Sequence, residues 1–197
     1  REKNWRDNQL TYGAIRLAVG EKDGLDYFNF SKKGFWQSFT AAIIIAPLFI
    51  LLLSVKYKVS DNDINVIRFA FIYSIAYVIG WVAFPLIVNY ITVMIGRGQK
   101  FIHYIVVYNW ASVPQNIFYL PFAISVEAQI LQGTTANATG LFLLSLVFLY
   151  TYFITKVALK ISSGIAAGIV VFDLILNIII SAITQRTVHM IKDKLWI

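Results

Sequence analysis

The stretch GIVVFDLILNIIISAIT, residues 168–184, is a continuous apolar run with a single carboxylate, Asp173, in its first half. About 20 residues of this kind cross the ~30 Å hydrocarbon layer of a bilayer as one α-helix. Inserting an ionised carboxylate in the middle of such a helix costs about 2.5–3.5 kcal/mol. The stretch therefore predicts a transmembrane helix in which Asp173 faces the protein interior, where polar neighbours can compensate it.

The composition extends this interpretation to the whole chain. Of its 197 residues, 58% are hydrophobic and 14% are charged, whereas soluble domains are typically about half apolar and about a quarter charged. Lipid must therefore cover part of the apolar surface, and we expect an all-α, polytopic membrane protein whose transmembrane domain covers 34–184. Five segments are long and apolar enough to be transmembrane helices: 34–55, 69–95, 101–124, 140–159 and 164–184.

The polar N-terminal segment, residues 1–33, contains a candidate amphipathic helix that Gly20 would end. Residues 27–36 then mix aromatic rings with lysines, a composition typical of the membrane–water interface. We expect an N-terminal helix at that interface; the alternative is a disordered polar tail. The apolar face of the helix carries Leu10, Ala14, Leu17 and Ala18.

Five spans assign each connection to one of the two sides of the membrane, and lysine and arginine residues are divided unevenly between these sides. The N-terminal segment and the connections at 95–101 and 156–163 carry eleven of the 17, and the other side carries six. Connections on the cytoplasmic side of membrane proteins are enriched in these residues. We therefore expect a multi-pass protein of a bacterial inner membrane, with a cytoplasmic N-terminus and a short external tail at 185–197.

The sequence has no pattern for catalysis, a metal or a cofactor. It has no cysteine, and its two histidines, His103 and His189, are in no ligand spacing. The segment GRGQK, 96–100, lacks the Lys-Ser/Thr ending of a phosphate-binding loop, and no two carboxylates share a span. We expect a protein that is not an enzyme. The net charge of +7 lies at span ends and not on one face, which argues against nucleic acid as a partner.

Polar residues recur at helical spacing in two of the predicted spans. Because successive residues of a helix are ~100° apart, each set falls on one side of its helix. Facing one another, the two stripes would form a polar seam inside the bundle. Such a seam can be a transport path, or it can simply join helices by hydrogen bonds of ~0.6–2 kcal/mol. Its residues are Asp173, Asn177 and Ser181 in the fifth span and Asn109, Ser112 and Asn116 in the third.

Asp173 is expected to be the centre of this seam. Lys and Arg are absent at its depth in the other spans, so we expect its carboxyl group to be largely protonated and to form hydrogen bonds to neutral partners. The nearest candidates are Asn109 on the third span and Asn177, one turn along the same helix.

Gly164 and Gly168 form a Gly-x-x-x-Gly pair at the start of the fifth span. Small residues at this spacing allow a second helix to approach closely in a membrane. The sequence therefore predicts a helix-packing site here, with another span of this chain or another protein as the partner.

The segment GRGQKFIHYIVVYNWASVP, residues 96–114, and the layout of five spans after a polar N-terminal segment resemble the Yip1 domain family of membrane proteins. The local likeness is a glycine-containing turn, the aromatic residues after it and a proline inside the third span: Gly96, Gly98, Tyr104, Tyr108, Trp110 and Pro114. This resemblance implies a non-enzymatic membrane protein that acts through partners, in membrane organisation. Asp173 and the short N-terminal segment are not part of the family pattern.

Two functions are compatible with these features. The first is a scaffold or accessory subunit whose spans bind a membrane-protein partner or a second copy of the chain. The second is a small transporter or ion-pathway component that uses the seam around Asp173. Reconstituted flux of protons or small solutes would favour the transporter, and co-purification with a defined complex would favour the scaffold.

Overall fold

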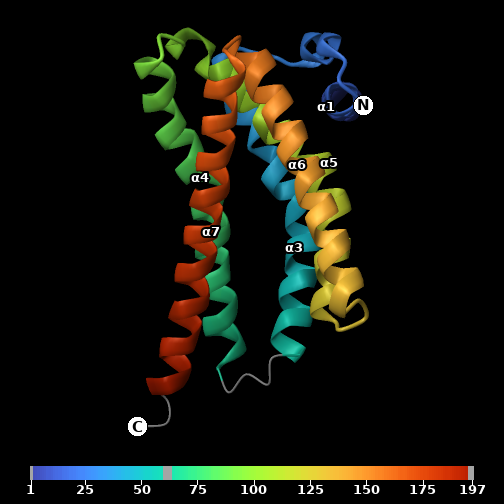
Figure 1. Cartoon of the computed structure of the whole chain (residues 1–197), viewed down its shortest axis with the longest axis vertical. Coiled ribbons are helices and arrows are strands. Elements are labelled where there is room, and N and C mark those ends of the chain that lie inside the picture. The colour runs from blue at the N-terminus through green and yellow to red at the C-terminus, as the bar shows by residue number, and fades with distance from the viewer. Residues whose placement is uncertain (1, 60–63, 195–197) are drawn as a thin grey trace.

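Helices dominate the computed structural model, which describes residues 2–59 and 64–194 (Figure 1). Three short elements lie at one end: the 3-10 turns η1 (Lys22–Tyr27) and η2 (Gly98–Lys100) and the helix α2 (Lys32–Ser38). The long helices are α1 (Glu2–Ala18), α3 (Thr40–Val59), α4 (Val66–Met94), α5 (Phe101–Glu127), α6 (Gly133–Leu159) and α7 (Ser163–Lys194).

Within the described residues, four helical segments are long and apolar enough to cross a membrane: α2 with α3, α4, α6 and α7. They coincide with four of the five predicted spans. The predicted third span, 101–124, is α5, which has 27 residues but falls short of the apolar content of the other four. Since α5 packs against α1, α2, α3 and α6, protein covers much of its surface in place of lipid. Ten of its residues are buried, and this burial allows it to carry polar side chains.

The long helices form two groups that meet near one end of the molecule (Figure 1). In one group α4 packs against α7, and in the other α5 packs against α3 and α6. A small core joins the groups, with Phe84 and Val88 from α4, Tyr104 from α5, Leu159 from α6 and Ile169 from α7. The groups are therefore fixed to each other near this end.

The same end of the molecule carries the N-terminal segment, η2 and the connection between α6 and α7 (Figure 1). We call it the lysine-rich end, because Arg97, Lys100, Lys156 and Lys160 are found there. The end of α3, the start of α4, the connection from α5 to α6 and the end of α7 lie at the opposite end (Figure 1). The structure thus brings together the three segments that the sequence groups by positive charge.

The last helix is longer than expected. The sequence predicts a span that ends at residue 184 and a separate tail, but α7 continues to Lys194 as one helix. Residues 185–194 are therefore helical and continuous with the predicted span, their external position stays a prediction, and residues 195–197 lie outside the described part. The physical reason is that no glycine or proline occurs between 169 and 194 to end the helix.

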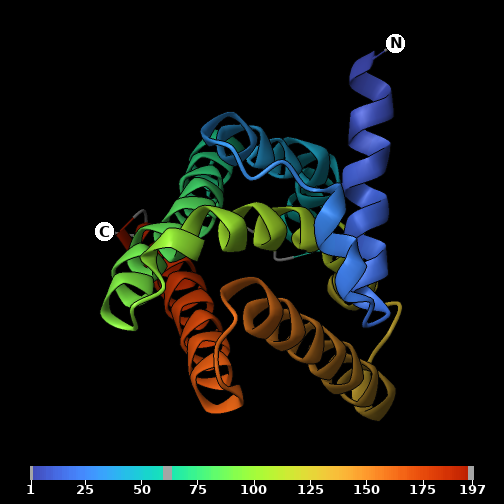
Figure 2. The ribbon, with the colours of Figure 1, turned by 90° about the horizontal axis from the view of Figure 1, so that it is seen from above.

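Helix α1 lies across the lysine-rich end, roughly perpendicular to the long helices (Figure 2). It ends at Ala18, and Gly20 follows with a positive φ of 87°. Ala14 and Leu17 are buried in the core that α1 shares with α5 and α6, and the Tyr150 hydroxyl of α6 donates to the Ala14 carbonyl at 2.6 Å. The apolar face of α1 therefore contacts protein, where the sequence predicts lipid.

Two glycines allow η1 to cross α1 closely. A Cβ on Gly24 would lie 2.6 Å from the Gly13 carbonyl oxygen and 2.8 Å from Leu17 Cγ. Both distances are shorter than van der Waals contact, so a side chain at residue 24 must push η1 away from α1.

We predict that Gly24→Val destabilises the packing of α1 by about 1–3 kcal/mol, the usual range for overpacking. The measurement is limited trypsin digestion of the purified protein, with cleavage at Arg16 and Lys22 expected to become faster. Ala18→Val is the control, because it also introduces a valine, at an exposed position of α1. Unchanged digestion of Gly24→Val would contradict the close crossing.

Candidate functional site

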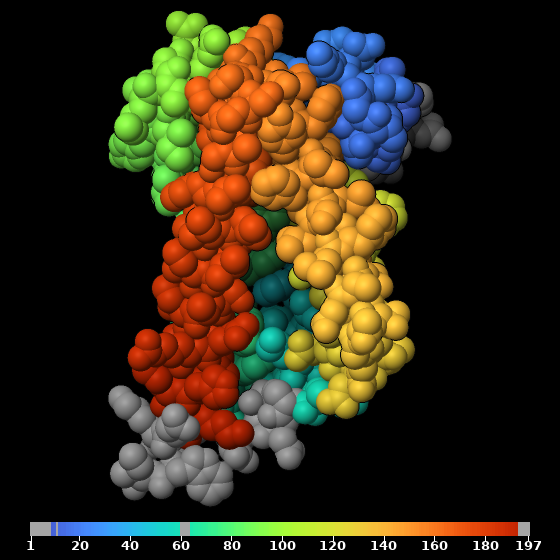
Figure 3. Space-filling view, in the orientation of Figure 1, coloured from blue at the N-terminus to red at the C-terminus, as the bar shows by residue number. Residues whose placement is uncertain are grey.

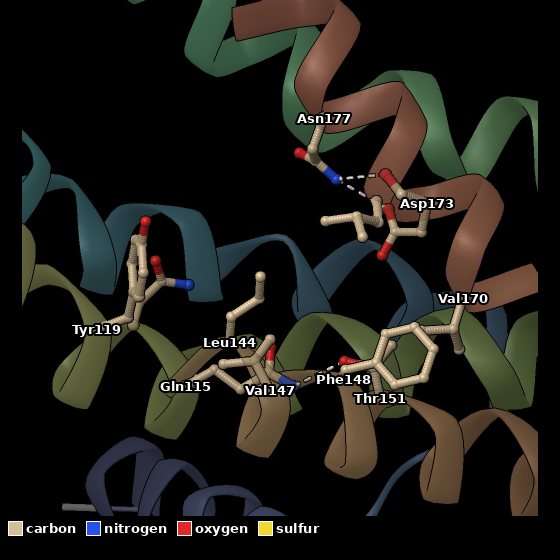
Figure 4. A pocket seen from close by; sticks show the side chains of 11 residues that line it. Gln115, Tyr119, Leu144, Val147, Phe148, Thr151, Val170, Asp173 and Asn177 are labelled. Carbon is tan, nitrogen blue, oxygen red and sulfur yellow. Dashed lines mark hydrogen bonds between the residues drawn. The ribbon is translucent and has the colours of Figure 1, made fainter. Parts of the chain in front are cut away.

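A cavity of about 510 Å³ lies between the two helix groups and is lined by residues of α3, α4, α5, α6 and α7. A second hollow of about 250 Å³, between α5, α6 and α7, shares seven residues with it (Figure 4). The surface is hollowed between α6 and α7, where the helices behind them can be seen (Figure 3). The bundle is thus open between α6 and α7, two helices that are apolar enough to face lipid.

Asp173 projects from α7 into this cavity and is only 8% exposed. Its Oδ2 atom accepts a hydrogen bond from the Tyr108 hydroxyl of α5 at 2.8 Å. The Asn177 side-chain amide, one turn along α7, donates to Asp173 Oδ1 at 3.0 Å and to the Asp173 backbone carbonyl at 2.9 Å. Two neutral donors therefore satisfy the carboxyl group, as expected for an acid in this environment.

Five of the six residues of the predicted seam line the cavity: Asp173, Asn177, Ser181, Ser112 and Asn116. Thr184 extends the stripe on α7. Apart from the contact between Tyr108 and Asp173, these polar groups of α5 and α7 face a shared hollow. Ser112 and Asn116 instead donate to backbone carbonyls of α5 itself, at 2.6 and 2.8 Å, and their acceptor oxygens have capacity for a further partner.

Asn109 is the exception. It is fully buried and donates from its side chain to Ser38 Oγ of α2 at 2.8 Å. The predicted hydrogen bond between Asp173 and Asn109 is therefore wrong. One residue turns a helix by ~100°, so the face of α5 that points at α7 is the face of Tyr108, and Asn109 points toward α2.

Tyr108, Gln115 and Thr151 are polar lining residues that the sequence reasoning missed. Gln115 donates to Thr151 Oγ1 at 3.1 Å and so joins α5 to α6 (Figure 4). A signal was present: positions 108, 112, 115 and 119 recur at intervals of four, three and four and share one helix face. A tyrosine in an apolar run indicates an aromatic core residue, although the Tyr108 hydroxyl is also a hydrogen-bond donor.

The cavity lining carries one acid and no base among the described residues. Asp173 is its only carboxylate, and no Lys, Arg or His belongs to it. Lys56 contacts one lining residue, Tyr73: its Nζ lies 5.9 Å from the centre of the Tyr73 ring and 3.7 Å from the Glu127 carboxylate. Asp173 therefore lacks a positive partner within the described lining.

Gly164 and Gly168 lie on an exposed face of α7. A Cβ built at either position meets no atom within 4 Å, so no described helix of this chain packs closely there. Of the two partners that the sequence allows for this pair, another span of the chain is ruled out for the described residues. Another protein or a second copy stays a prediction.

Four apolar helices in the described part of the chain indicate a multi-pass α-helical membrane protein, and a cavity with several polar side chains lies between them. Comparison of the chain with protein-family models, with curated proteins and with solved structures finds no match. The function must therefore be argued from the cavity.

We predict that Asp173→Asn lowers the free energy of unfolding by less than about 1 kcal/mol, because an amide oxygen can still accept from Tyr108. Asp173→Leu should lower it by about 1–3 kcal/mol, since it leaves the hydroxyl of Tyr108 without an acceptor. Unfolding in detergent, followed by circular dichroism, measures both.

Ser145→Leu is the matched control for this comparison. Ser145 is exposed on α6 and bonds only to the Leu141 carbonyl of its own helix, at 2.8 Å, so its replacement should be neutral. Equal stability of Asp173→Leu and the wild type would show that the carboxyl group does not hold α5 and α7 together.

Proposed function

We propose that this chain is a non-catalytic, multi-pass membrane protein that admits a small solute or ion to the cavity around Asp173, as a small transporter or ion-pathway component. The observation that carries the proposal is the carboxyl group of Asp173, 8% exposed and turned into a cavity of about 510 Å³. Ionisable groups inside a membrane domain are costly and mark substrate or ion pathways.

The shape of the seam supports a pathway over a purely structural role. Polar groups that only join helices would be expected to bond to one another across the interface. Here Asp173 bonds across the interface to Tyr108, but the side-chain hydrogen bonds of Ser112, Asn116, Ser181 and Thr184 stay within their own helices, and these side chains line a hollow. Polar surface that faces a hollow inside a membrane is stabilised when water or a solute occupies it.

A binding role fits the lining better than a catalytic one. General acid–base chemistry commonly uses two groups that exchange protons with the substrate. The lining offers a single carboxylate and no histidine among the described residues.

We further propose that α5 is a fifth membrane helix and that the lysine-rich end is cytoplasmic. Two neighbours of α5 support the first point. Helix α5 packs against α3 and α6, and these two helices run along the long axis of the molecule. The concentration of lysine and arginine at one end supports the second. A bacterial inner membrane stays part of the proposal.

A scaffold that binds another membrane protein is the second candidate. The bare face at Gly164 and Gly168 favours it, since small residues with nothing against them leave room for a helix of a partner. The resemblance to the Yip1 domain family points the same way. Co-purification of the full chain with a defined complex, lost on Gly168→Leu, is the result that would place this candidate first.

The pathway proposal is tested by the access of water to the cavity. The chain has no native cysteine, so Ser112→Cys and Ser181→Cys can be labelled singly in proteoliposomes with a membrane-impermeant methanethiosulfonate. Both should react at least about tenfold faster than the control Ser145→Cys, which is exposed on α6 outside the cavity, because only a thiolate in contact with water is reactive. Equally slow reaction at all three positions would refute the proposal.

A further inference from the structure

We infer that the ligand of the cavity around Asp173 is an organic cation, an amine or quaternary ammonium with apolar substituents. The inference rests on the proposed function, because it names the ligand class for the same cavity. Three features of the lining lead to it: an uncompensated carboxylate, a stripe of aromatic rings and an apolar opening.

The first feature is the charge of the lining. Tyr108 and Asn177 each donate to one oxygen of Asp173, and a carboxylate has about four lone-pair positions. Both donors are neutral, so an ionised Asp173 retains its full negative charge, and the described lining contains no cation. Buried charges in proteins are paired, and a positively charged ligand supplies the missing partner. A proton on the carboxyl group competes with this ligand for the same place.

The second feature is aromatic. Tyr73, Tyr77 and Trp81 recur every four residues along α4, so their rings form one stripe that lines the cavity. Phe49 of α3 stacks on Tyr77 with 4.5 Å between ring centres. Ring faces attract ammonium groups, and this attraction is stronger where water is excluded.

One end of the stripe already holds a cation. Lys56 Nζ lies 5.9 Å from the centre of the Tyr73 ring, but Lys56 is not part of the lining. The rings of Tyr77 and Trp81, farther along α4, have no cation beside them among the contacts of the described residues. A ligand between these two rings and Asp173 would find both a counter-charge and a ring face.

The third feature is the opening between α6 and α7. Its walls are apolar, with Leu144, Val147 and Phe148 from α6 and Val170 and Leu174 from α7 (Figure 4). Ca²⁺ and Mg²⁺ take about six or more oxygen ligands, with carboxylates among them, which these walls do not offer. Apolar walls suit the alkyl or aryl groups of an organic cation.

The experiment compares two probes of the same shape. Benzyltrimethylammonium carries a positive charge, and neopentylbenzene is its neutral carbon isostere. Binding to the full-length protein in detergent is measured by isothermal titration calorimetry. The wild type should bind the cation more tightly than the isostere, and Asp173→Asn should weaken cation binding at least about tenfold, because it removes the counter-charge.

The aromatic contribution is measured separately. Trp81→Leu should weaken cation binding roughly two- to thirtyfold, whereas Trp81→Phe keeps a ring face and should retain most of it. Ser145→Ala, outside the cavity, should bind as the wild type does. Circular dichroism of each variant shows that it is folded.

Equal affinity of the wild type and Asp173→Asn for benzyltrimethylammonium would overturn the inference, and so would equal affinity of the wild type for the two probes. Absence of cation binding would also overturn it. In each case, rapid labelling of Ser112→Cys and Ser181→Cys would leave the proposed pathway standing, because that result does not depend on ligand charge. Slow labelling would instead remove the proposed function itself.

Discussion

The hydrogen bond from Tyr108 to Asp173, 2.8 Å long, is a polar contact between α5 and α7 across the hollow that separates the two helix groups. The groups meet in an apolar core at the lysine-rich end, around Phe84, Tyr104 and Ile169. A carboxyl group placed within an apolar helix needs such a partner, because neither lipid nor alkyl side chains can hydrogen-bond to it. The position of α7 relative to α5 is therefore tied to the chemistry of one acid.

The same contact accounts for the character of the cavity. Tyr108 and Asn177 satisfy Asp173 only with neutral groups, so its surroundings favour either a bound proton or a bound cation. The stripe on α4 that includes Tyr77 and Trp81 adds ring faces to the opposite wall. A membrane protein whose helices merely packed together would gain more from closing this hollow with apolar side chains. The proposed binding of a ligand would require such an open hollow.

The apolar helices and the polar stripe of Asp173, Asn177 and Ser181 on α7 could be predicted from the sequence, since both depend only on composition and on the period of a helix. It was insufficient where tertiary packing decides. Asn109 was assigned to the seam, yet the rotation of α5 directs it to Ser38 and puts Tyr108 opposite Asp173. The length of α7 was missed because residues 185–194 are polar, although nothing in them ends a helix. Gly164 indicates close packing, but its partner cannot be read from one chain.

A double-mutant cycle measures the interaction of Tyr108 with Asp173, which joins α5 to α7 at the cavity. The free energy of unfolding is measured in mixed detergent for the wild type, Tyr108→Phe, Asp173→Ala and the double variant. Tyr108→Phe keeps the ring that packs 4.6 Å from the ring of Phe84 and removes only the hydroxyl. We predict a coupling free energy between Tyr108 and Asp173 of about 0.5–2 kcal/mol, the range for hydrogen bonds between membrane helices. A coupling indistinguishable from zero would contradict it.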